Sequence, residues 1–311
     1  MTAGNSLNSH PSAGNDEYSC TPPVIVLSFN RPRYLQPVLE SLRKQIPEID
    51  ASRVHLFQDG AVNAFSGIRY AEDRDIAECM ALFRDLFPRG HLHVSQQNIG
   101  ICENFLLAER FAFLTLRAPV AYFFEDDLVL SENYLAALDA LRRSFSTEPR
   151  IGYFNACGAR RSSLEEQRKN LGKIKDMQQL WGFALKRSHW NDMQPLLASY
   201  YKLVCGQDYR RRPHDAIRAL YQTWGFSRKH SSQDAAKDLA THALGHWRAS
   251  TYICLARYIG EQGTHSNPAL YAERGFADTI VFDQAPPKRF VVRKADIDAG
   301  ISRKDDLYRK G

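Results

Sequence analysis

Apolar and polar positions follow two different periods along the first half of the chain. Five short runs of bulky, often β-branched residues are bounded by turn-forming residues, which predicts strands buried on both faces. The runs span residues 23–29, 54–57, 91–95, 120–124 and 151–154. Between them, apolar residues recur every three or four positions, which predicts helices. These helices are expected from Pro32, within 69–87, from Gly100, and behind an N-cap at Ser131.

Alternating strands and helices of this length predict a mostly parallel sheet with helices on both faces, and therefore an α/β fold. The second half of the chain is less regular. Its polar segment 159–175 predicts a loop, and 180–186 predicts a strand. Two further helices are expected, from Pro213 to Gly225 and from Ser232 to Gly245.

Composition changes this picture only slightly. The 41 Lys and Arg residues against 35 Asp and Glu leave a net charge of +6 on 311 residues, and we expect no nucleic-acid partner. No run approaches the ~20 apolar residues of a membrane span, and the polar residues 1–22 predict a disordered tail rather than a signal peptide. Six scattered cysteines without a CxxC pair predict free thiols in a reducing cytoplasm.

Small polar residues follow four of the predicted strands. They read SFNR at 28–31, QDG at 58–60, QQNIG at 96–100 and EDD at 125–127. In parallel sheets, ligands bind outside the carboxyl ends of the strands, so these four segments predict a ligand crevice. The chain contains no GxGxxG motif, which argues against a dinucleotide oxidoreductase.

The acidic triplet Glu125-Asp126-Asp127 carries the strongest chemical signal. Three adjacent carboxylates repel one another unless a cation or strong hydrogen-bond donors neutralise them. Hard cations such as Mn²⁺ or Mg²⁺ take carboxylate oxygens and leave positions for phosphates, so a metal here can bridge the diphosphate of a nucleotide-sugar. An acidic cluster at a helix N-terminus explains the spacing equally well.

The sequence FFEDD after an apolar strand resembles the metal motif of GT-A glycosyltransferases, especially the acidic triplet of the N-acetylglucosaminyltransferase I family. Other segments resemble that family in the same order along the chain. The segments are FNRP at 29–32 and Gln58-Asp59-Gly60 for the nucleotide, Asn98-Ile99-Gly100 with Asn104 before the metal motif, Trp181-Gly182-Phe183 with Trp190 beside the acceptor, and 257–265, which closes over the donor phosphates.

The resemblance implies a GT-A fold and a metal-dependent, inverting transfer from a UDP-sugar, with UDP-N-acetylglucosamine favoured. It implies Mn²⁺ or Mg²⁺ as cofactor, held by Asp127 and by His265 as a candidate second ligand. The nucleotide-sugar contacts it implies are Ser28, Asn30, Arg31, Asp59, Gly60, Asn98, Gly100, Asn104, Glu125, Asp126 and Arg257. The acceptor contacts it implies are Trp181, Gly182 and Phe183.

An inverting transfer needs a carboxylate that removes a proton from the acceptor hydroxyl. The resemblance places this acid between the aromatic segment and the 257–265 segment, where Asp234 ranks first and Asp208 second. Asp234 is equally explained as a first-turn helix acid.

The acceptor is open on sequence grounds: a glycan, a lipid-linked or a small-molecule acceptor all fit. Arg160-Arg161 and Arg210-Arg211-Arg212 are candidates for an anionic acceptor at a membrane surface, or are solvated charges. We expect a cytoplasmic enzyme with a nucleotide-sugar half at 23–150, an acceptor half at 151–275 and a C-terminal extension at 276–311. A nucleotidyltransferase and a non-catalytic sugar-binding relative are the alternatives.

Overall fold

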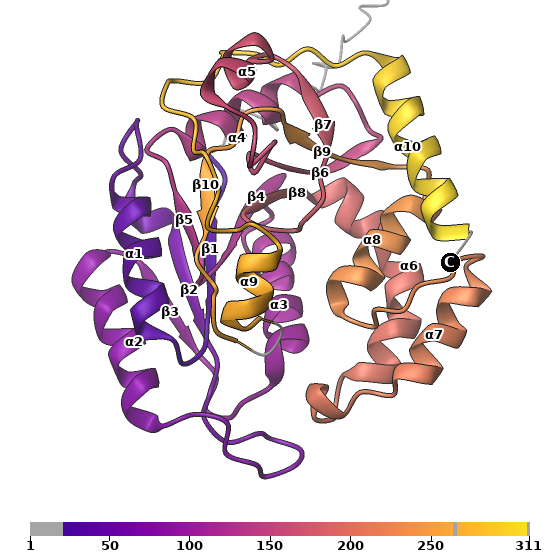
Figure 1. Ribbon diagram of the computed structural model, residues 1–311. Coiled ribbons are helices and arrows are strands. Elements are labelled where there is room, and N and C mark those ends of the chain that lie inside the picture. The colour runs from indigo at the N-terminus through magenta and orange to yellow at the C-terminus, as the bar shows by residue number, and fades with distance from the viewer. Residues whose placement is uncertain (1–20, 264–265, 310–311) are drawn as a thin grey trace, which may run out of the picture.

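The computed structural model describes residues 21–263 and 266–309 as a three-layer α/β arrangement around one sheet (Figure 1). Its eight strands lie in the order β3-β2-β1-β4-β8-β6-β9-β7. Their bounds are β1 (Val24–Ser28), β2 (Val54–Gln58), β3 (His91–Val94), β4 (Val120–Glu125), β6 (Ile151–Asn155), β7 (Ile174–Asp176), β8 (Phe183–Lys186) and β9 (Trp247–Thr251). Only β7 and β8 run against the others, so the predicted α/β fold with a mostly parallel sheet is confirmed.

Helices cover both faces of this sheet. Their bounds are α1 (Pro32–Arg43), α2 (Asp73–Leu86), α3 (Gly100–Arg110), α4 (Tyr134–Ser144), α5 (Leu164–Lys169), α6 (Arg187–Val204), α7 (His214–Thr223), α8 (Gln233–Ala243), α9 (Pro268–Glu273) and α10 (Lys294–Arg309). A separate two-stranded sheet pairs β5 (Leu128–Leu130) with β10 (Ala256–Tyr258) in antiparallel fashion. One π-helical turn, 111–115, prolongs α3.

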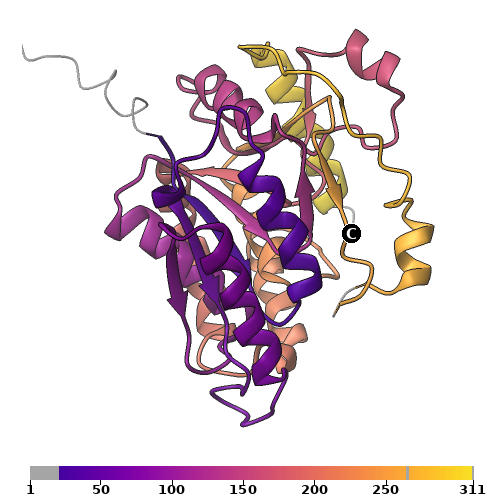
Figure 2. The ribbon, with the colours of Figure 1, turned by 90° about the vertical axis from the view of Figure 1, so that its left-hand side faces the viewer.

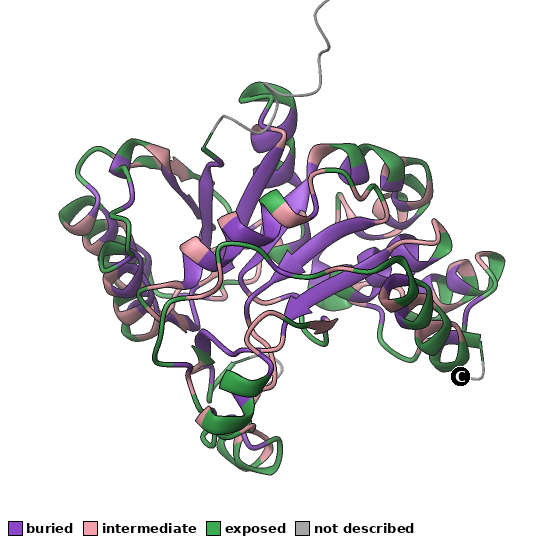
Figure 3. Ribbon diagram, turned by 90° about the horizontal axis from the view of Figure 1, so that it is seen from above, coloured by how far each residue is buried: buried purple, intermediate pink, exposed green. Residues whose placement is uncertain are grey.

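The alternation of side chains along β1 divides the core into two clusters. Val24 and Val26 face the cluster that contains the apolar residues of α1, α2 and α4. Ile25 and Leu27 face the cluster that contains those of α3, α6, α7 and α8. Helices α1 and α2 pack side by side on their face (Figure 2). The central strands are buried and the outer faces of the helices are exposed (Figure 3), as expected for strands covered on both sides.

The five strands predicted in the first half all form, and so does a strand within 180–186. Two local predictions are wrong. Helix α4 begins at Tyr134 with Asn133 at its N-cap, because the chain first forms β5 and the backbone amide of Ser131 donates to the carbonyl of Leu255 (2.8 Å). The segment 159–175 is not a loop, because it forms α5, capped by the hydroxyl of Ser163, and the edge strand β7.

The boundary predicted near residue 150 falls between α4 and β6. Strands on both sides of it belong to the same sheet, so the two predicted halves share one β-scaffold. The C-terminal segment ends in α10, which packs against α8 and β9. Among the described residues, no helix has both the length and the apolar character needed to cross a membrane.

Three histidines cluster on the neighbouring strands β2 and β3. His55 Nδ1 lies 3.2 Å from His93 Nε2, and the ring of His55 stacks on that of His91 with centroids 4.7 Å apart. The edge of Phe111 closes the cluster (5.0 Å between centroids). Burial, together with the charges of His91 and His93, lowers the pKa of His55 to about 4.

This pKa predicts a stability loss in acid. The unfolded chain gains a proton at the ordinary pKa of 6.5, but folded His55 resists protonation until about pH 4, so stability falls as the pH drops from 6.5 toward 4. The His55 contribution is about 3 kcal/mol at most. Urea unfolding at about pH 7 and about pH 4.5 should show a smaller acid loss in His55→Gln than in the natural protein. Exposed His230→Gln is the control and should not change the loss; equal losses in all three proteins would contradict the assignment.

Candidate active site

The sheet order places a topological switch point between β1 and β4. From β1 the chain moves to β2 on one side and later returns to β4 on the other. Both strands run parallel to β1, so their carboxyl ends meet at one edge, with Leu27 in register with Glu125. Ligands bind at such a topological switch point because the connecting loops diverge there.

Arg31 and the acidic triplet meet at this point. Arg31 stands at the N-cap of α1, and its Nε lies 3.2 Å from Asp126 Oδ2. Its Nη2 contacts Asp126 Oδ1 and lies 2.8 Å from Asp127 Oδ2. Both aspartates are buried, so one guanidinium supplies the cationic partner that the adjacent carboxylates require.

Glu125 completes the triplet at the last position of β4. Burial raises the pKa of its carboxyl well above the ordinary value, and the charges of Asp127 and Asp234 raise it further. Burial also raises the pKa of Asp127, to about 6, with Asp126 adding to the effect and Arg31 opposing it. The three carboxylates therefore remain under-neutralised despite Arg31, which favours a further cation at this point.

The segment that follows β10 lies directly over the triplet. The amide of Ile259 donates to the backbone carbonyl of Asp127 (2.8 Å). A Cβ on Gly260 would lie 2.8 Å from Asp127 Oδ2 and 2.3 Å from the Tyr258 hydroxyl, so only glycine fits here. The amide of Gln262 donates to the hydroxyl of Tyr34 on α1 (3.1 Å). This close cover was predicted from 257–265 by resemblance, but Tyr258 and Gly260 were not singled out.

The structure places neither Arg257 nor His265, both predicted as site residues, against the acidic triplet. His265 lies outside the described residues. Arg257 lies on β10 with an exposed side chain, and its Nη2 donates to the carbonyl of Thr279 (3.1 Å). Its role toward a nucleotide-sugar stays a prediction.

Asp59 joins the ends of β2 and β3. Its Oδ1 accepts from the amides of Gly60 and Ile99 (both 2.9 Å), and its Oδ2 from Asn98 Nδ2 (2.8 Å) and the amide of Gly100 (3.0 Å). Burial raises the pKa of Asp59 to about 6, although these amides lower it. The Asp59 carboxylate therefore ties the segment after β2 to the segment after β3. The predicted contact of Asp59 with a nucleotide base stays a prediction.

The other predicted nucleotide contacts surround the same edge. Buried Ser28 ends β1, and Asn30 Nδ2 donates weakly to the carbonyl of Tyr70 (3.5 Å). Gly100 opens α3 with a φ of +77°, a conformation that favours glycine. Asn104 is buried and donates to the carbonyl of Phe57 (3.3 Å), which ties α3 to β2.

The two candidate bases differ in their surroundings. Asp208 is buried, and its Oδ2 accepts from the hydroxyls of Tyr70 (2.6 Å) and Ser66 (2.8 Å). Burial opposes ionisation of Asp208, but these hydrogen bonds lower its pKa below the ordinary value. Asp234 lies in the first turn of α8 with an exposed side chain, and its charge reaches Glu125. Surrounding protein raises the pKa of Asp234, although Lys237 opposes the rise.

The aromatic segment separates into a site residue and a core residue. Trp181 stacks on Tyr258, with ring centroids 4.4 Å apart and planes 4° apart, so it adjoins the cover of the triplet. Gly182 adopts a φ of +51°, and its carbonyl accepts from the Tyr134 hydroxyl (2.7 Å). The ring of Phe183 is buried against that of Phe123 on β4, and its predicted contact with an acceptor stays a prediction.

A buried charge network lies behind Asp234. Lys237 Nζ pairs with Glu109 of α3, and the two side chains are 2% and 0% exposed. The indole of Trp190, predicted near the acceptor, donates to Glu109 (3.1 Å) instead. Asp238, one turn of α8 after Asp234, pairs with Arg248 of β9. The sequence analysis missed this network, whose only signal is charged residues on otherwise apolar helix faces.

The donor atoms of the triplet fit a hard divalent cation only in part. Within the described segments, no three His, Cys, Asp or Glu side chains form a ready metal site. Arg31 engages both oxygens of Asp126 and one oxygen of Asp127, so the oxygens without an Arg31 contact are Asp127 Oδ1 and those of Glu125. Mg²⁺ is commonly bound through one or two carboxylates plus substrate phosphates and water, so this donor set fits a metal that binds together with a diphosphate.

Comparisons with known proteins add little to this geometry. No protein-family model and no curated protein matches the chain. Among solved structures, the chain is similar to glucosyl-3-phosphoglycerate synthase from Mycobacterium tuberculosis, in a complex with Mn²⁺, UDP-glucose and glycerol 3-phosphate and in another with Mn²⁺, UDP and glucosyl-3-phosphoglycerate. Each match has 14% identity and a TM-score of 0.37, and covers 76% of this chain and 86% of the other. Similarity this low does not bear on activity.

The network behind Asp234 yields a stability prediction. Glu109→Gln keeps the shape of the side chain but leaves the buried charge of Lys237 without its partner, which should cost about 3–5 kcal/mol. The matched control is Glu165→Gln, which breaks the exposed Glu165–Lys169 pair and should cost less than about 1 kcal/mol. Urea unfolding measures both. Equal costs would show that the Glu109 pair contributes no more than a surface pair.

Proposed function

We propose that this protein is a metal-dependent glycosyltransferase of the GT-A type that uses a UDP-sugar donor. One observation carries the proposal: the buried carboxylates of Asp126 and Asp127, which follow half-buried Glu125, pair with Arg31 at the switch point of an α/β sheet. An acidic cluster that merely favoured a helix N-terminus would be exposed, and α4 begins only at Tyr134. The full sequence of motifs from residue 29 to 265 supports the same family resemblance.

In this proposal the donor diphosphate lies between the end of β1 and the triplet. Arg31 holds Asp126 in place and presents a guanidinium toward the phosphates. Asp127, with Glu125 beside it, is the metal ligand. When bound, Mn²⁺ or Mg²⁺ neutralises the charge that develops on the departing nucleoside diphosphate. The segment 258–260 covers these groups and excludes water from them.

Asp234 acts as the general base. The acceptor hydroxyl oxygen forms a bond to the anomeric carbon of the donor sugar, while the bond from that carbon to the diphosphate oxygen breaks and its electron pair leaves with the diphosphate. The hydroxyl proton passes to the Asp234 carboxylate. Because the hydroxyl attacks the face of the anomeric carbon opposite the leaving diphosphate, the anomeric configuration inverts. The raised pKa of Asp234 makes it a stronger proton acceptor than Asp208.

The donor sugar and the setting rest on the sequence alone. The resemblance favours UDP-N-acetylglucosamine as the donor, and a cytoplasmic setting stays a prediction. Loop 58–60, held by Asp59, is the proposed contact for the uracil.

The first experiment separates the three candidate activities. The protein is incubated with Mn²⁺ and a panel of radiolabelled nucleotide-sugars. Release of nucleoside diphosphate supports transfer, release of pyrophosphate supports a nucleotidyltransferase, and no turnover supports a binding protein.

The variant Asp127→Asn should lower nucleoside diphosphate release at least about a hundredfold and should weaken Mn²⁺ binding. Electron paramagnetic resonance in the presence of UDP measures the Mn²⁺ binding. Asp283→Asn, in an exposed ion pair with Arg168, is the control. Full activity in Asp127→Asn would remove the central assignment.

A second prediction concerns the base. Asp234→Asn should lower kcat about 10²- to 10⁴-fold, because it removes the proton acceptor, and should leave the affinity for UDP within about threefold. Asp208→Asn should lower kcat far less, because the hydrogen bonds of Asp208 to Ser66 and Tyr70 are structural. Steady-state kinetics with UDP titrations measures both variants. A larger kcat loss in Asp208→Asn than in Asp234→Asn would reverse the assignment.

A further inference from the structure

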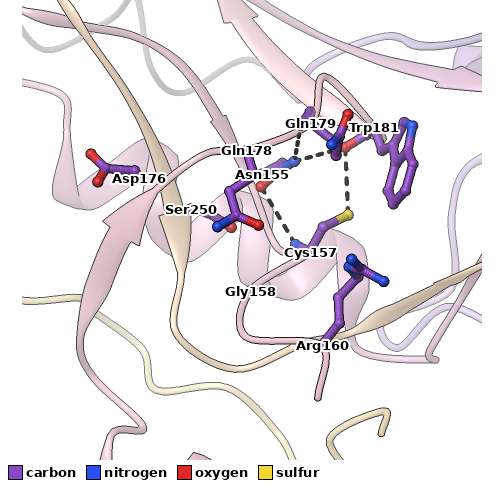
Figure 4. Close-up of a pocket in the computed structure, with 9 residues that line it drawn as sticks. All are labelled: Asn155, Cys157, Gly158, Arg160, Asp176, Gln178, Gln179, Trp181 and Ser250. Carbon is purple, nitrogen blue, oxygen red and sulfur yellow. Dashed lines mark hydrogen bonds between the residues drawn. The ribbon is translucent and has the colours of Figure 1, made fainter. Parts of the chain in front are cut away.

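A narrow recess of about 10 Å³ lies beside Trp181 (Figure 4), whose indole also stacks on Tyr258. Its walls include Asn155 at the end of β6, Arg160 in the loop that follows β6, and Ser250 on β9. The recess is too narrow for a sugar ring and has room for about one oxygen atom of a ligand, whose other atoms would lie at its mouth. Its lining is predominantly polar, so a small hydrogen-bonding group suits it best.

Arg160 lies in this recess without an anionic partner. Its guanidinium is stacked 4.7 Å from the ring centroid of Phe276 and 5.8 Å from that of Trp181. The Nη1 atom is buried and has no hydrogen-bond partner among the described residues. Burial lowers the pKa of Arg160, as expected for a cation that has lost water without gaining an anion. A half-buried guanidinium with one buried, unpaired nitrogen suits an anionic ligand.

The other charged groups near the recess do not neutralise Arg160. Asp176 lies across the recess from it (Figure 4), where its Oδ2 accepts from Arg303 Nε (2.9 Å) and its Oδ1 from the Trp247 indole. Burial lowers the pKa of Lys175, Asp176 opposes this shift, and the charge of nearby Arg160 adds to it. The local field is therefore positive, and it attracts anions.

Ser250 supplies an independent indication of a ligand. Its side chain is 3% exposed, and its Oγ has no hydrogen-bond partner in the described parts of the chain. Buried hydroxyl groups without a hydrogen-bond partner are uncommon, so a water or ligand oxygen is expected beside such a group. Ser250 and Arg160 line the same recess, so one oxygen-rich group can satisfy both.

The recess adjoins the proposed reaction centre through a row of contacts. The guanidinium of Arg160 faces the indole of Trp181, and that indole stacks on Tyr258 at 4.4 Å. The Tyr258 hydroxyl in turn approaches Asp127 closely around Gly260. A group held by Arg160 therefore lies beside the acidic triplet but is separated from it by two rings.

We propose that this recess is an anion subsite in which Arg160, with Ser250, binds the phosphate or carboxylate group of the acceptor. Its assignment to the acceptor rests on the proposed transfer function, whereas anion binding itself does not. The subsite selects negatively charged acceptors, because a neutral acceptor would leave the Arg160 charge desolvated and unpaired.

Inorganic phosphate is the first probe. Nuclear magnetic resonance titration should show saturable shifts of the Trp181 indole and Arg160 Nε–H signals. Arg160→Gln should weaken phosphate binding, read at Trp181, about tenfold or more, and Ser250→Ala should weaken it less. The charge-preserving Arg160→Lys should retain part of the affinity. Arg161→Gln is the matched control, because Arg161 is adjacent and exposed and does not line the recess. Thermal unfolding verifies that each variant is folded.

A second arm identifies the source of the anion. Sedimentation with vesicles containing phosphatidic acid, compared with phosphatidylcholine alone, tests a lipid phosphate. Binding to the acidic vesicles that is lost in Arg160→Gln assigns the subsite to a lipid-linked acceptor, and phosphate binding alone assigns it to a soluble acceptor. No saturable shift with phosphate, or equal affinity in Arg160→Gln, would overturn the subsite. Phosphate binding without turnover of any nucleotide-sugar would retain the subsite and remove the transfer function.

Discussion

The arrangement of the site depends on one electrostatic problem: the half-buried Glu125 at the end of β4 is followed directly by two buried carboxylates, Asp126 and Asp127. Like charges in a low-dielectric position must be neutralised or protonated. Arg31 neutralises part of this negative charge, because the strand order β2-β1-β4 brings the end of β1 and the start of α1 against the triplet. The pKa values of Glu125 and Asp127 remain raised, so the pair with Arg31 leaves capacity for a second cation. The fold therefore leaves negative charge that Arg31 does not neutralise, and the proposed chemistry uses this charge to bind a metal.

A second set of buried charges shapes the opposite wall. Removing an ion pair from water is costly unless its geometry and hydrogen bonding are good. Glu109 meets both conditions, since one oxygen accepts from Lys237 and the other from the Trp190 indole. These contacts join α3, α6 and α8 and fix the first turn of α8, from which Asp234 extends. The rigidity of the proposed base therefore comes from residues that never contact a substrate.

The sequence predicts the strands because each is a continuous apolar run, and it predicts the triplet because acids directly follow such a run. It fails where burial is not apolar. Strand β9 carries Arg248 and two hydroxyl residues, so no periodicity marks it although all its residues are buried. The role of Phe183 stays open on sequence grounds, because an aromatic residue beside a turn looks the same whether it faces a core or a ligand. The roles of Asp59 and Asp208 needed coordinates, because their partners lie about 40 and 140 residues away in sequence.

The two sides of the site have opposite polarity. The triplet provides excess negative charge around Asp127, which suits a cation bound to a diphosphate. The recess beside Trp181 provides a positive charge at Arg160 that no described carboxylate pairs with. The stacked rings of Trp181 and Tyr258 separate these fields, so neither charge neutralises the other. A donor and an acceptor that both carry phosphate would then be sorted by environment: the donor needs a metal beside the triplet, whereas a single anionic group is stabilised directly by the guanidinium. In the proposed function, such an arrangement would orient two similarly charged substrates, because exchanging their positions would put a phosphate against unneutralised carboxylates.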